Sequence, residues 1–156
     1  MGRITPFLWF EDQAEQAAEF YVSLFPNSRI TGRYGDAGRD QPGRPLTISF
    51  ELDGAAFTAL NGGPYYKLNG AFSMSVDCAD QAEVDRLWDA LLADGGQAIQ
   101  CGWLTDRFGL TWQIVPSALP RLLADPDRAK AQRVMDAMMP MIKLDVAGLE
   151  AAAADA

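Results

Sequence analysis

The chain contains no histidine among its 156 residues. Imidazole is the commonest metal ligand of proteins and their usual general base at neutral pH. Its absence excludes histidine-ligated metal sites and the usual Ser-His-Asp and Cys-His catalytic arrangements. Cysteine is scarce as well, since only Cys78 and Cys101 are present and neither belongs to a Cys-x-x-Cys pair. We therefore expect two free thiols and a reducing, cytoplasmic setting.

Membrane and nucleic-acid signals are also missing. No apolar run approaches the roughly 20 residues that span a bilayer, and the N-terminus lacks the basic and apolar regions of a signal peptide. Lys and Arg number 13 against 21 Asp and Glu, which gives a formal charge of −8. Because phosphate groups repel such a chain, we expect neither a nucleic-acid nor a membrane partner.

Glycine-rich nucleotide-binding turns are absent too. The first strand-to-helix turn, at residues 11–13, has no glycine, although a nucleoside-type methyl donor usually needs one there. The Gly62-Gly63 pair precedes no helical pattern and lacks the Lys-Ser/Thr of a phosphate loop. What the sequence does contain is 49% hydrophobic residues, enough for a core that needs no metal or disulfide.

A four-residue motif occurs twice. Asp12-Gln13-Ala14-Glu15 recurs as Asp80-Gln81-Ala82-Glu83. In each copy the Asp can cap a helix and the Glu can reach back to the cap. Each copy follows a strand-like run, 4–10 or 72–78, and precedes an amphipathic helical pattern. The repeated order of strand, cap and helix predicts two related modules.

Further strands follow each helix. Apolar alternation and turn signals predict strands at 28–34, 46–52, 55–61, 97–100, 103–105 and 110–115. Asp53-Gly54 is typical of a tight hairpin. Each module therefore has the order β-α-β-β-β. After the last strand the sequence predicts three helices: 117–124, a second starting at Asp125-Pro126 and ending near Met139, and a third capped by Asp145.

The predicted fold class is α+β, within one compact domain. The first βαβββ module occupies residues 1–63, the linker 64–71, and the second βαβββ module 72–116. Residues 117–156 form a helical C-terminal extension.

The sequence resembles the PhnB-like branch of the vicinal-oxygen-chelate superfamily, which includes glyoxalases, extradiol dioxygenases and bleomycin-resistance proteins. The segments that carry the resemblance are 4–10 (ITPFLWF), 18–21 (AEFY), 25–28 (FPNS), 50–54 (FELDG), 57–64 (FTALNGGP), 100–104 (QCGWL) and 112–116 (WQIVP). The tail resembles the branch as well. Such proteins are often labelled as a 3-demethylubiquinone methyltransferase domain, and the resemblance implies a homodimer of glyoxalase-like fold.

The resemblance also bears on metal binding. Metal-using members of the superfamily hold a divalent ion with His and Glu side chains in sheet-lined cups. Here the carboxylate position of the last strand is matched by Gln113, a neutral amide and a weaker ligand. We therefore expect no metal and no cofactor. An all-oxygen site using Glu51 or Asp77 is the alternative.

Aromatic and polar side chains on the predicted strands are candidates for a ligand pocket. The candidate pocket residues are Phe7, Trp9, Asn61, Ser73, Ser75, Cys101, Trp103 and Gln113. The alternative for the aromatic residues is ordinary core packing. For Cys101 the favoured interpretation is a half-buried small hydrophobe, and the alternative is a thiolate stabilised by Arg107.

Three other features have two interpretations each. The arginines Arg29, Arg33, Arg39 and Arg44 suit solvated loop charge better than an anion site. Residues 61–67 form either a pocket lip or the linker between modules. A methionine-rich stripe, Val134 to Met141, predicts contact with a partner, the alternative being the chain's own core.

We therefore expect a metal-free small-molecule binding protein with an aromatic-lined cup. The alternative is an enzyme of unassigned reaction on an oxygen-rich or quinone-like molecule, with Asn61, Gln113 or Cys101 polarising it. A weaker third interpretation is an interaction module built on the methionine-rich stripe.

Overall fold

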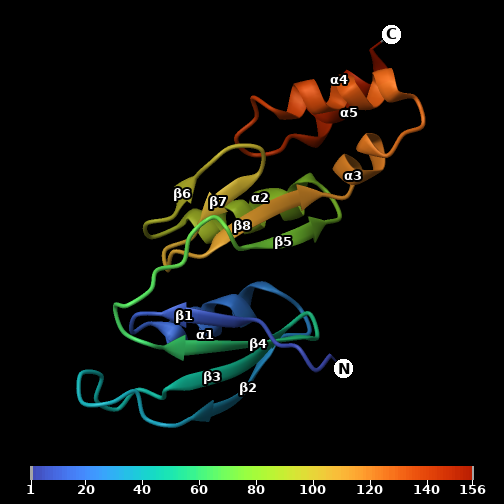
Figure 1. Ribbon diagram of the computed structural model, residues 1–156. Helices are drawn as coiled ribbons and strands as arrows, with labels where there is room; N and C mark the ends of the chain where they lie inside the picture. Colours follow the sequence, from blue (N-terminus) through green and yellow to red (C-terminus); the bar gives the residue numbers. More distant parts are fainter. Residues whose placement is uncertain (1, 156) are drawn as a thin grey trace. The chain divides into compact units, whose positions relative to one another are not determined.

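A computed structural model describes residues 2–155. The chain divides into two compact units, Met1–Leu68 and Asn69–Ala156, and the boundary falls within the predicted linker. Each unit contains one βαβββ module, and the second also carries the helical extension (Figure 1). The predicted α+β class and the two tandem modules are confirmed.

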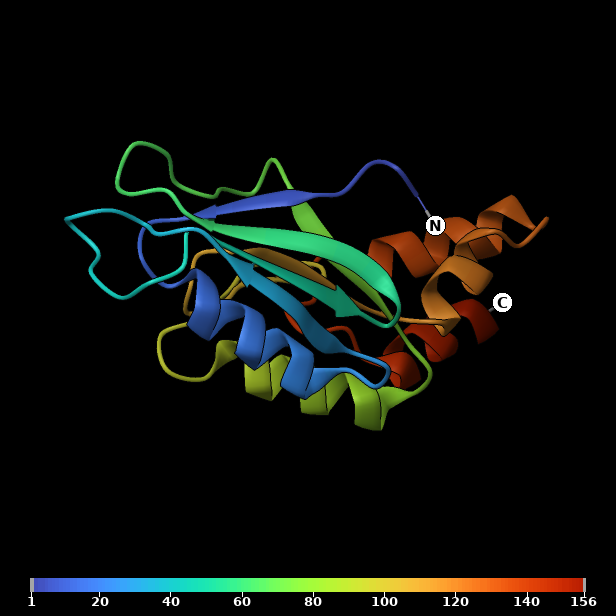
Figure 2. The same ribbon diagram turned by 90° about the horizontal axis from the view of Figure 1, so that it is seen from below.

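The N-terminal unit is a four-stranded sheet with one helix. Its elements are β1 (Phe7–Phe10), α1 (Ala14–Leu24), β2 (Arg29–Tyr34), β3 (Thr47–Leu52) and β4 (Ala55–Asn61). The strand order is β1-β4-β3-β2, with β1 parallel to β4 and the other pairs antiparallel. Helix α1 lies along one face of this sheet (Figure 2). The predicted hairpin is confirmed, because Asp53 and Gly54 have φ of 48° and 80°, the left-handed conformations that a tight two-residue turn requires.

Strand alternation explains which sheet face carries the core. Ile48 and Phe50 of β3 are fully buried, as are Ala17 and Tyr21 of α1. Alanines at the contact let the helix approach the sheet closely, and Tyr21 fills the remaining space against Phe50. The alternate side chains of β3 face the opposite side of the sheet.

The C-terminal unit repeats this topology. Its module consists of β5 (Ser73–Cys78), α2 (Gln81–Leu92), β6 (Gln97–Ala98), β7 (Trp103–Thr105) and β8 (Thr111–Pro116). The order β5-β8-β7-β6 matches β1-β4-β3-β2 strand for strand, again with one parallel pair. Leu104, Trp112 and Ile114 are buried on the face that α2 covers.

Three helices follow the second sheet: α3 (Ala118–Leu123), α4 (Arg128–Met138) and α5 (Val146–Ala154). They share a core of their own, made by Leu119, Leu122, Val134, Leu144, Leu149 and Ala153. Met138 and Met141 pack against this core. These two methionines are partly buried in the chain's own core, which was the alternative interpretation, and the predicted partner contact of the stripe stays a prediction. No helix in residues 2–155 is long and apolar enough to cross a membrane.

The two copies of the repeated motif begin their helices differently. At α2 the predicted Asp cap is confirmed, because Glu83 N donates to Asp80 Oδ1 at 2.9 Å. Glu83 Oε2 accepts from Ala79 N at 3.1 Å, one residue before the cap. At α1 the prediction is wrong. Asn61, from the end of β4, accepts from Ala14 N at 2.8 Å, and Asp12 instead pairs with an exposed arginine.

The caps of the extension also differ from prediction. Helix α4 is capped by Asp127, which accepts from the backbone of Ala129 and Lys130, whereas Asp125 accepts from Asp127 N. Asp145 stands at the N-cap of α5 but makes no side-chain capping bond. Gln81 replaces it, since its Oε1 accepts from Val146 N at 2.7 Å.

The capping of α1 leads to a stability prediction. Asn61 is 2% exposed and also donates to Pro45 O at 2.9 Å. Asn61→Ala leaves a buried donor and a buried acceptor unpaired, so we expect it to lower the free energy of unfolding by about 2 kcal/mol. Asp12→Ala is the matched control and should cost less than about 0.5 kcal/mol. Urea unfolding measures both. A larger loss for Asp12→Ala than for Asn61→Ala contradicts this account.

Candidate functional site

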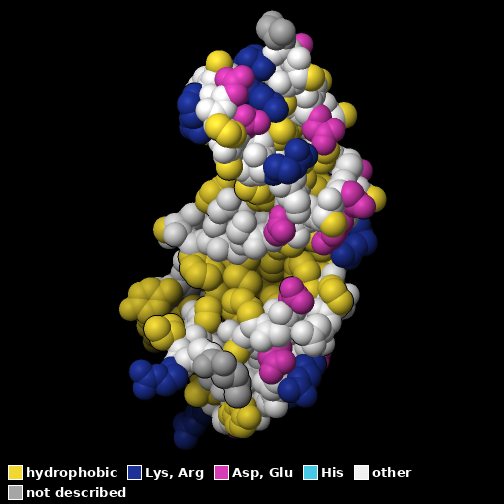
Figure 3. Space-filling model, turned by 90° about the vertical axis from the view of Figure 1, so that its right-hand side faces the viewer, with side chains coloured by type: hydrophobic (Ala, Val, Ile, Leu, Met, Phe, Trp, Pro, Cys, Tyr) yellow, Lys and Arg dark blue, Asp and Glu magenta, His cyan; other side chains and the backbone are white. Residues whose placement is uncertain are grey.

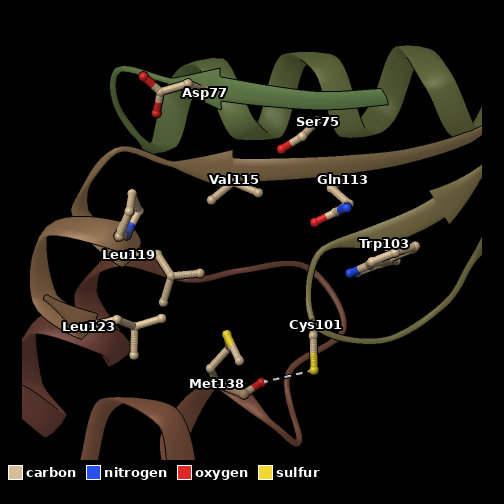
Figure 4. Close-up of a pocket in the computed structure, with 10 residues that line it drawn as sticks. Ser75, Asp77, Cys101, Trp103, Gln113, Val115, Leu119, Leu123 and Met138 are labelled. Carbon is tan, nitrogen blue, oxygen red and sulfur yellow. Dashed lines mark hydrogen bonds between the residues drawn. The ribbon is translucent and has the colours of Figure 1, made fainter. Parts of the chain in front are cut away.

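The C-terminal unit contains a pocket of about 500 Å³ between its sheet and its helical extension (Figure 4). The lining residues are Ser75, Asp77, Cys101, Trp103, Gln113, Val115, Leu119, Pro120, Leu123 and Met138. The strand residues among them alternate with the residues that face α2. One face of the sheet therefore builds the core, and the other face lines the pocket.

The helical extension supplies the apolar wall opposite the strands. Leu119 and Leu123 of α3 and Met138 of α4 face Val115 and Gln113 across the pocket (Figure 4). Leu119 and Leu123 are four residues apart, so they project from the same side of α3. The pocket exists only because this extension lies against the second sheet.

Backbone hydrogen bonds hold the extension beside the β6–β7 loop. Cys101 N donates to Met141 O and Gly102 N donates to Ile142 O, both at 2.8 Å. A Cβ at Gly102 would lie 2.9 Å from the side chain of Leu144, and φ there is +83°. Gly102 therefore permits both the turn and the close approach of the two segments.

The amide of Gln113 lies at the centre of the polar part of the pocket. Its Nε2 donates to Ser73 Oγ at 2.9 Å, which fixes the amide plane. Its Oε1 accepts no hydrogen bond from residues 2–155 and points into the pocket (Figure 4). Gln113 therefore presents a free acceptor to whatever occupies the space.

Asp77 lies at the rim of the same pocket. Its Oδ1 accepts from Ser117 Oγ at 2.8 Å. No Lys or Arg of residues 2–155 forms an ion pair with it. The carboxylate is thus held in place and keeps acceptor capacity for a ligand.

The two cysteines are free, as predicted. Cys101 is half-buried in the pocket wall, and its Sγ lies 3.3 Å from Met139 O and 3.8 Å from Met138 O. The predicted cation partner, Arg107, pairs with Asp94 at 3.1 Å. Cys78 faces the core, where burial, with smaller contributions from nearby carboxylates, raises the pKa of its thiol to about 12.

The other predicted site residues lie in the N-terminal unit. Phe7 and Trp9 are on β1, and Phe7 is 59% exposed. Trp9 Nε1 donates to Gly63 O at 2.9 Å, and its ring meets Tyr66 edge-on at 4.9 Å. A Cβ at Gly62 would lie 2.4 Å from the Trp9 ring, so the double glycine allows this segment to wrap around Trp9.

Asn61 needs a correction. The sequence pattern suggested that it faces a ligand cup with Ser73 and Ser75. It lies instead on the α1 side of its sheet, buried, with both amide groups engaged. Ser73 and Ser75 lie on the pocket side of the second sheet beside Gln113, because Ser75 is paired with Gln113 in the parallel register of β5 and β8.

The first-half arginines are largely paired with carboxylates. Arg33 contacts Glu15 and lies 3.1 Å from Glu19, and its hydrogen bond to Glu15 raises its pKa. Arg44 pairs with Asp12, and Arg33 and Arg44 border a second hollow of about 390 Å³. These pairs favour the interpretation as surface charge over an anion site.

The pocket donors do not fit a divalent ion. Residues 2–155 contain no group of three or more carboxylate or thiol side chains placed to hold a metal. Of the two carboxylates proposed for an all-oxygen site, Glu51 pairs with Arg29 and Asp77 accepts from Ser117. The oxygen ligands that line the pocket are one amide, one rim carboxylate and one hydroxyl, which together carry too little charge to displace the hydration of such an ion.

Sequence reasoning missed the helical wall of the pocket. The i, i+4 spacing of Leu119 and Leu123 marks an apolar face on α3, but nothing in the sequence says against which surface that face packs. Val115 could have been found, because it lies two residues after Gln113 on the same strand and shares its face.

Comparison with known protein families shows which family the chain belongs to. A family model described as 3-demethylubiquinone-9 3-methyltransferase matches residues 2–115, and the chain belongs to this family. The predicted PhnB-like resemblance is confirmed. The chain is 31% identical to a putative 3-demethylubiquinone-9 3-methyltransferase, PhnB protein, of Bacillus cereus, with a TM-score of 0.64 over 74% of this chain and 99% of that one.

A second structure, protein PA1353 of Pseudomonas aeruginosa, is 23% identical and has a TM-score of 0.59 over 74% of this chain and 98% of its own. It shows the shared fold. No curated protein matches the chain. Because the family match ends at residue 115, the predicted resemblance of the tail is not supported, and the extension that walls the pocket lies outside the matched region.

The surroundings of the two thiols predict different reactivities. A thiol with a pKa near 12 is almost entirely protonated at pH 8, so Cys78 should not react with a disulfide reagent in the folded protein. Cys101 should react, giving one accessible thiol per chain and two after denaturation. Colorimetric thiol titration measures this. A fast-reacting thiol that remains in Cys101→Ser overturns the assignment.

Proposed function

We propose that the protein binds a small organic molecule, without a metal ion, in the pocket of its C-terminal unit. The observation that carries this proposal is a pocket of about 500 Å³ with apolar walls and one free amide acceptor. That volume suits a drug-sized or smaller molecule. Of the three aromatic residues predicted to line the ligand cup, Trp103 lines this pocket. A role for Phe7 and Trp9 in ligand binding stays a prediction.

The lining favours a molecule with an apolar body and a small polar group. Val115, Leu123 and Met138 offer apolar contact, and Met adapts its shape to irregular ligands. Burying an apolar body here contributes roughly 25 cal/mol per Å² of area removed from water. The single oriented amide of Gln113 then selects the direction in which the molecule lies.

Catalysis on an oxygen-rich or quinone-like substrate is the second candidate. The observation in its favour is that Cys101 and Gln113 line the same pocket. Binding is preferred because the Cys101 thiol lies beside the carbonyl oxygens of Met138 and Met139, while Arg107 pairs with Asp94. An amide, moreover, cannot serve as a general base.

We do not assign the methyl transfer named in the family description to this pocket. A nucleoside-type methyl donor is usually held by a glycine-rich turn between a strand and a helix. The turn between β1 and α1, residues 11–13, has no glycine, and the first helical amide already donates to Asn61. The corresponding turn before α2 is closed by the side chains of Asp80 and Glu83.

We also propose that the protein is a cytoplasmic homodimer. Support comes from large apolar side chains exposed on the N-terminal unit, including Phe7, Tyr34, Tyr65 and Tyr66. Figure 3 shows apolar side chains, in yellow, gathered at the surface of the protein. Exposed groups of this size often mark contact surfaces. Light scattering should give twice the chain mass of 17.0 kDa at micromolar concentration, and the chain mass itself contradicts the dimer.

Ligand screening tests the pocket directly. Apolar and quinone-like compounds that raise the melting temperature should lose this effect in Gln113→Ala, because the oriented acceptor is gone. Binding should persist after dialysis against EDTA. The exposed Gln132→Ala on α4 is the control and should bind as the wild type does. Hits that Gln113→Ala leaves unchanged, or that EDTA abolishes, contradict the proposal.

A further inference from the structure

The charged side chain of the pocket is a carboxylate, which can only accept hydrogen bonds. Gln113 Oε1 has no protein donor, and Asp77 has one hydroxyl donor and no cation. Among residues 2–155, no Lys or Arg lines the pocket. The lining side chains also offer neutral donors: the indole N–H of Trp103, the second N–H of the Gln113 amide and the hydroxyl of Ser75. A ligand that carries a positively charged donor therefore suits this pocket better than one that carries an anionic acceptor.

The C-terminal unit carries a net negative charge, the same sign as the Asp77 carboxylate at the rim of the pocket. Residues 69–156 contain 13 Asp and Glu against 7 Lys and Arg, so this unit carries −6 of the formal charge of −8. The nearby positive side chains of the extension are engaged elsewhere: Arg121 pairs with Glu150, and Lys130 pairs with Asp125. The resulting field attracts cations and repels anions, most strongly at low ionic strength.

We propose that the natural ligand is an amphipathic amine: an apolar, preferably aromatic, body that carries an ammonium group. This rests on the proposed function of the same pocket. The ammonium lies at the rim, where Asp77 neutralises it. The apolar body occupies the space between Trp103 and the leucines of α3 (Figure 4).

The competing ligand classes fit less well. A carboxylate or phosphate would place a second negative charge beside Asp77 with no basic side chain to offset it. A neutral alcohol keeps the apolar contacts and can donate to Gln113, but it gains nothing from the carboxylate. The order of affinity should therefore be amine, alcohol, acid.

The test uses the full-length protein and three probes with one apolar body: 4-butylbenzylamine, 4-butylbenzyl alcohol and 4-butylbenzoate. Calorimetric titration at neutral pH and low salt should give an affinity for the amine about fivefold above that for the alcohol, as expected for a solvent-accessible charge pair. Asp77→Asn should remove this preference and leave the alcohol unchanged. Asp89→Asn removes the same charge from an exposed position on α2, so it should preserve the preference for the amine.

The possible failures are distinguishable. If the acid binds as tightly as the amine, or if Asp77→Asn keeps the preference for the amine, the amine proposal is wrong and the pocket remains a binding site. Ser75→Trp blocks the pocket from an exposed position, and Val115→Phe does so if the first variant fails to fold. If none of the probes binds, or if alcohol binding survives both blocks, the proposed function is wrong as well.

Discussion

The attachment of the helical extension to the second sheet creates the pocket of the C-terminal unit. Segment 139–146 passes beside the β6–β7 loop, where the amides of Cys101 and Gly102 donate to its carbonyls. At the other end, Gln81 accepts from Val146 N and donates to Leu144 O. These bonds position α3 and α4, and the side chains of α3 and α4 then form one wall of the pocket. Loss of this attachment would leave the pocket face of the sheet open to solvent.

The same attachment explains why the backbone is left-handed at two consecutive residues of the β6–β7 loop. Cys101 has φ of 58°, which is uncommon for a residue with a side chain, and Gly102 follows with φ of 83°. Two consecutive left-handed residues turn the chain sharply, so that both amides point at the extension. A small residue, Cys101, and a glycine, Gly102, occupy these two left-handed positions. The same turn places the thiol of Cys101 at the pocket wall.

Much of the fold was predictable because local patterns carry it. Strand alternation, the Asp53-Gly54 turn and the repeated motif predicted two βαβββ modules, and β4 and β7 have the predicted limits. The caps of α1 and α5 were not predictable. Asn61 is 47 residues from the backbone amide that it caps in α1, and Gln81 is 65 residues from the one that it caps in α5. Short-range spacing in the sequence cannot reveal such distant partners.

The site was half predictable for the same reason. Alternation on β5, β7 and β8 placed Ser75, Trp103 and Gln113 on one face. It failed for Asn61, whose register puts it on the helix side of β4. The wall of Leu119, Leu123 and Met138 depends on how three helices dock on a sheet, and no periodicity encodes that docking. Because the sequence has no histidine, the pocket has no imidazole, and its polar groups include the Gln113 amide and the Asp77 carboxylate.

Hydrogen exchange in the presence of a bound ligand tests the central claim, that the sheet face and the helical extension together form the binding site. A saturating hit from the ligand screen should slow exchange in two segments at once, β8 (Thr111–Pro116) and the helices from Ala118 to Met138. Protection confined to residues 2–68, or to the sheet without the helices, would contradict the account.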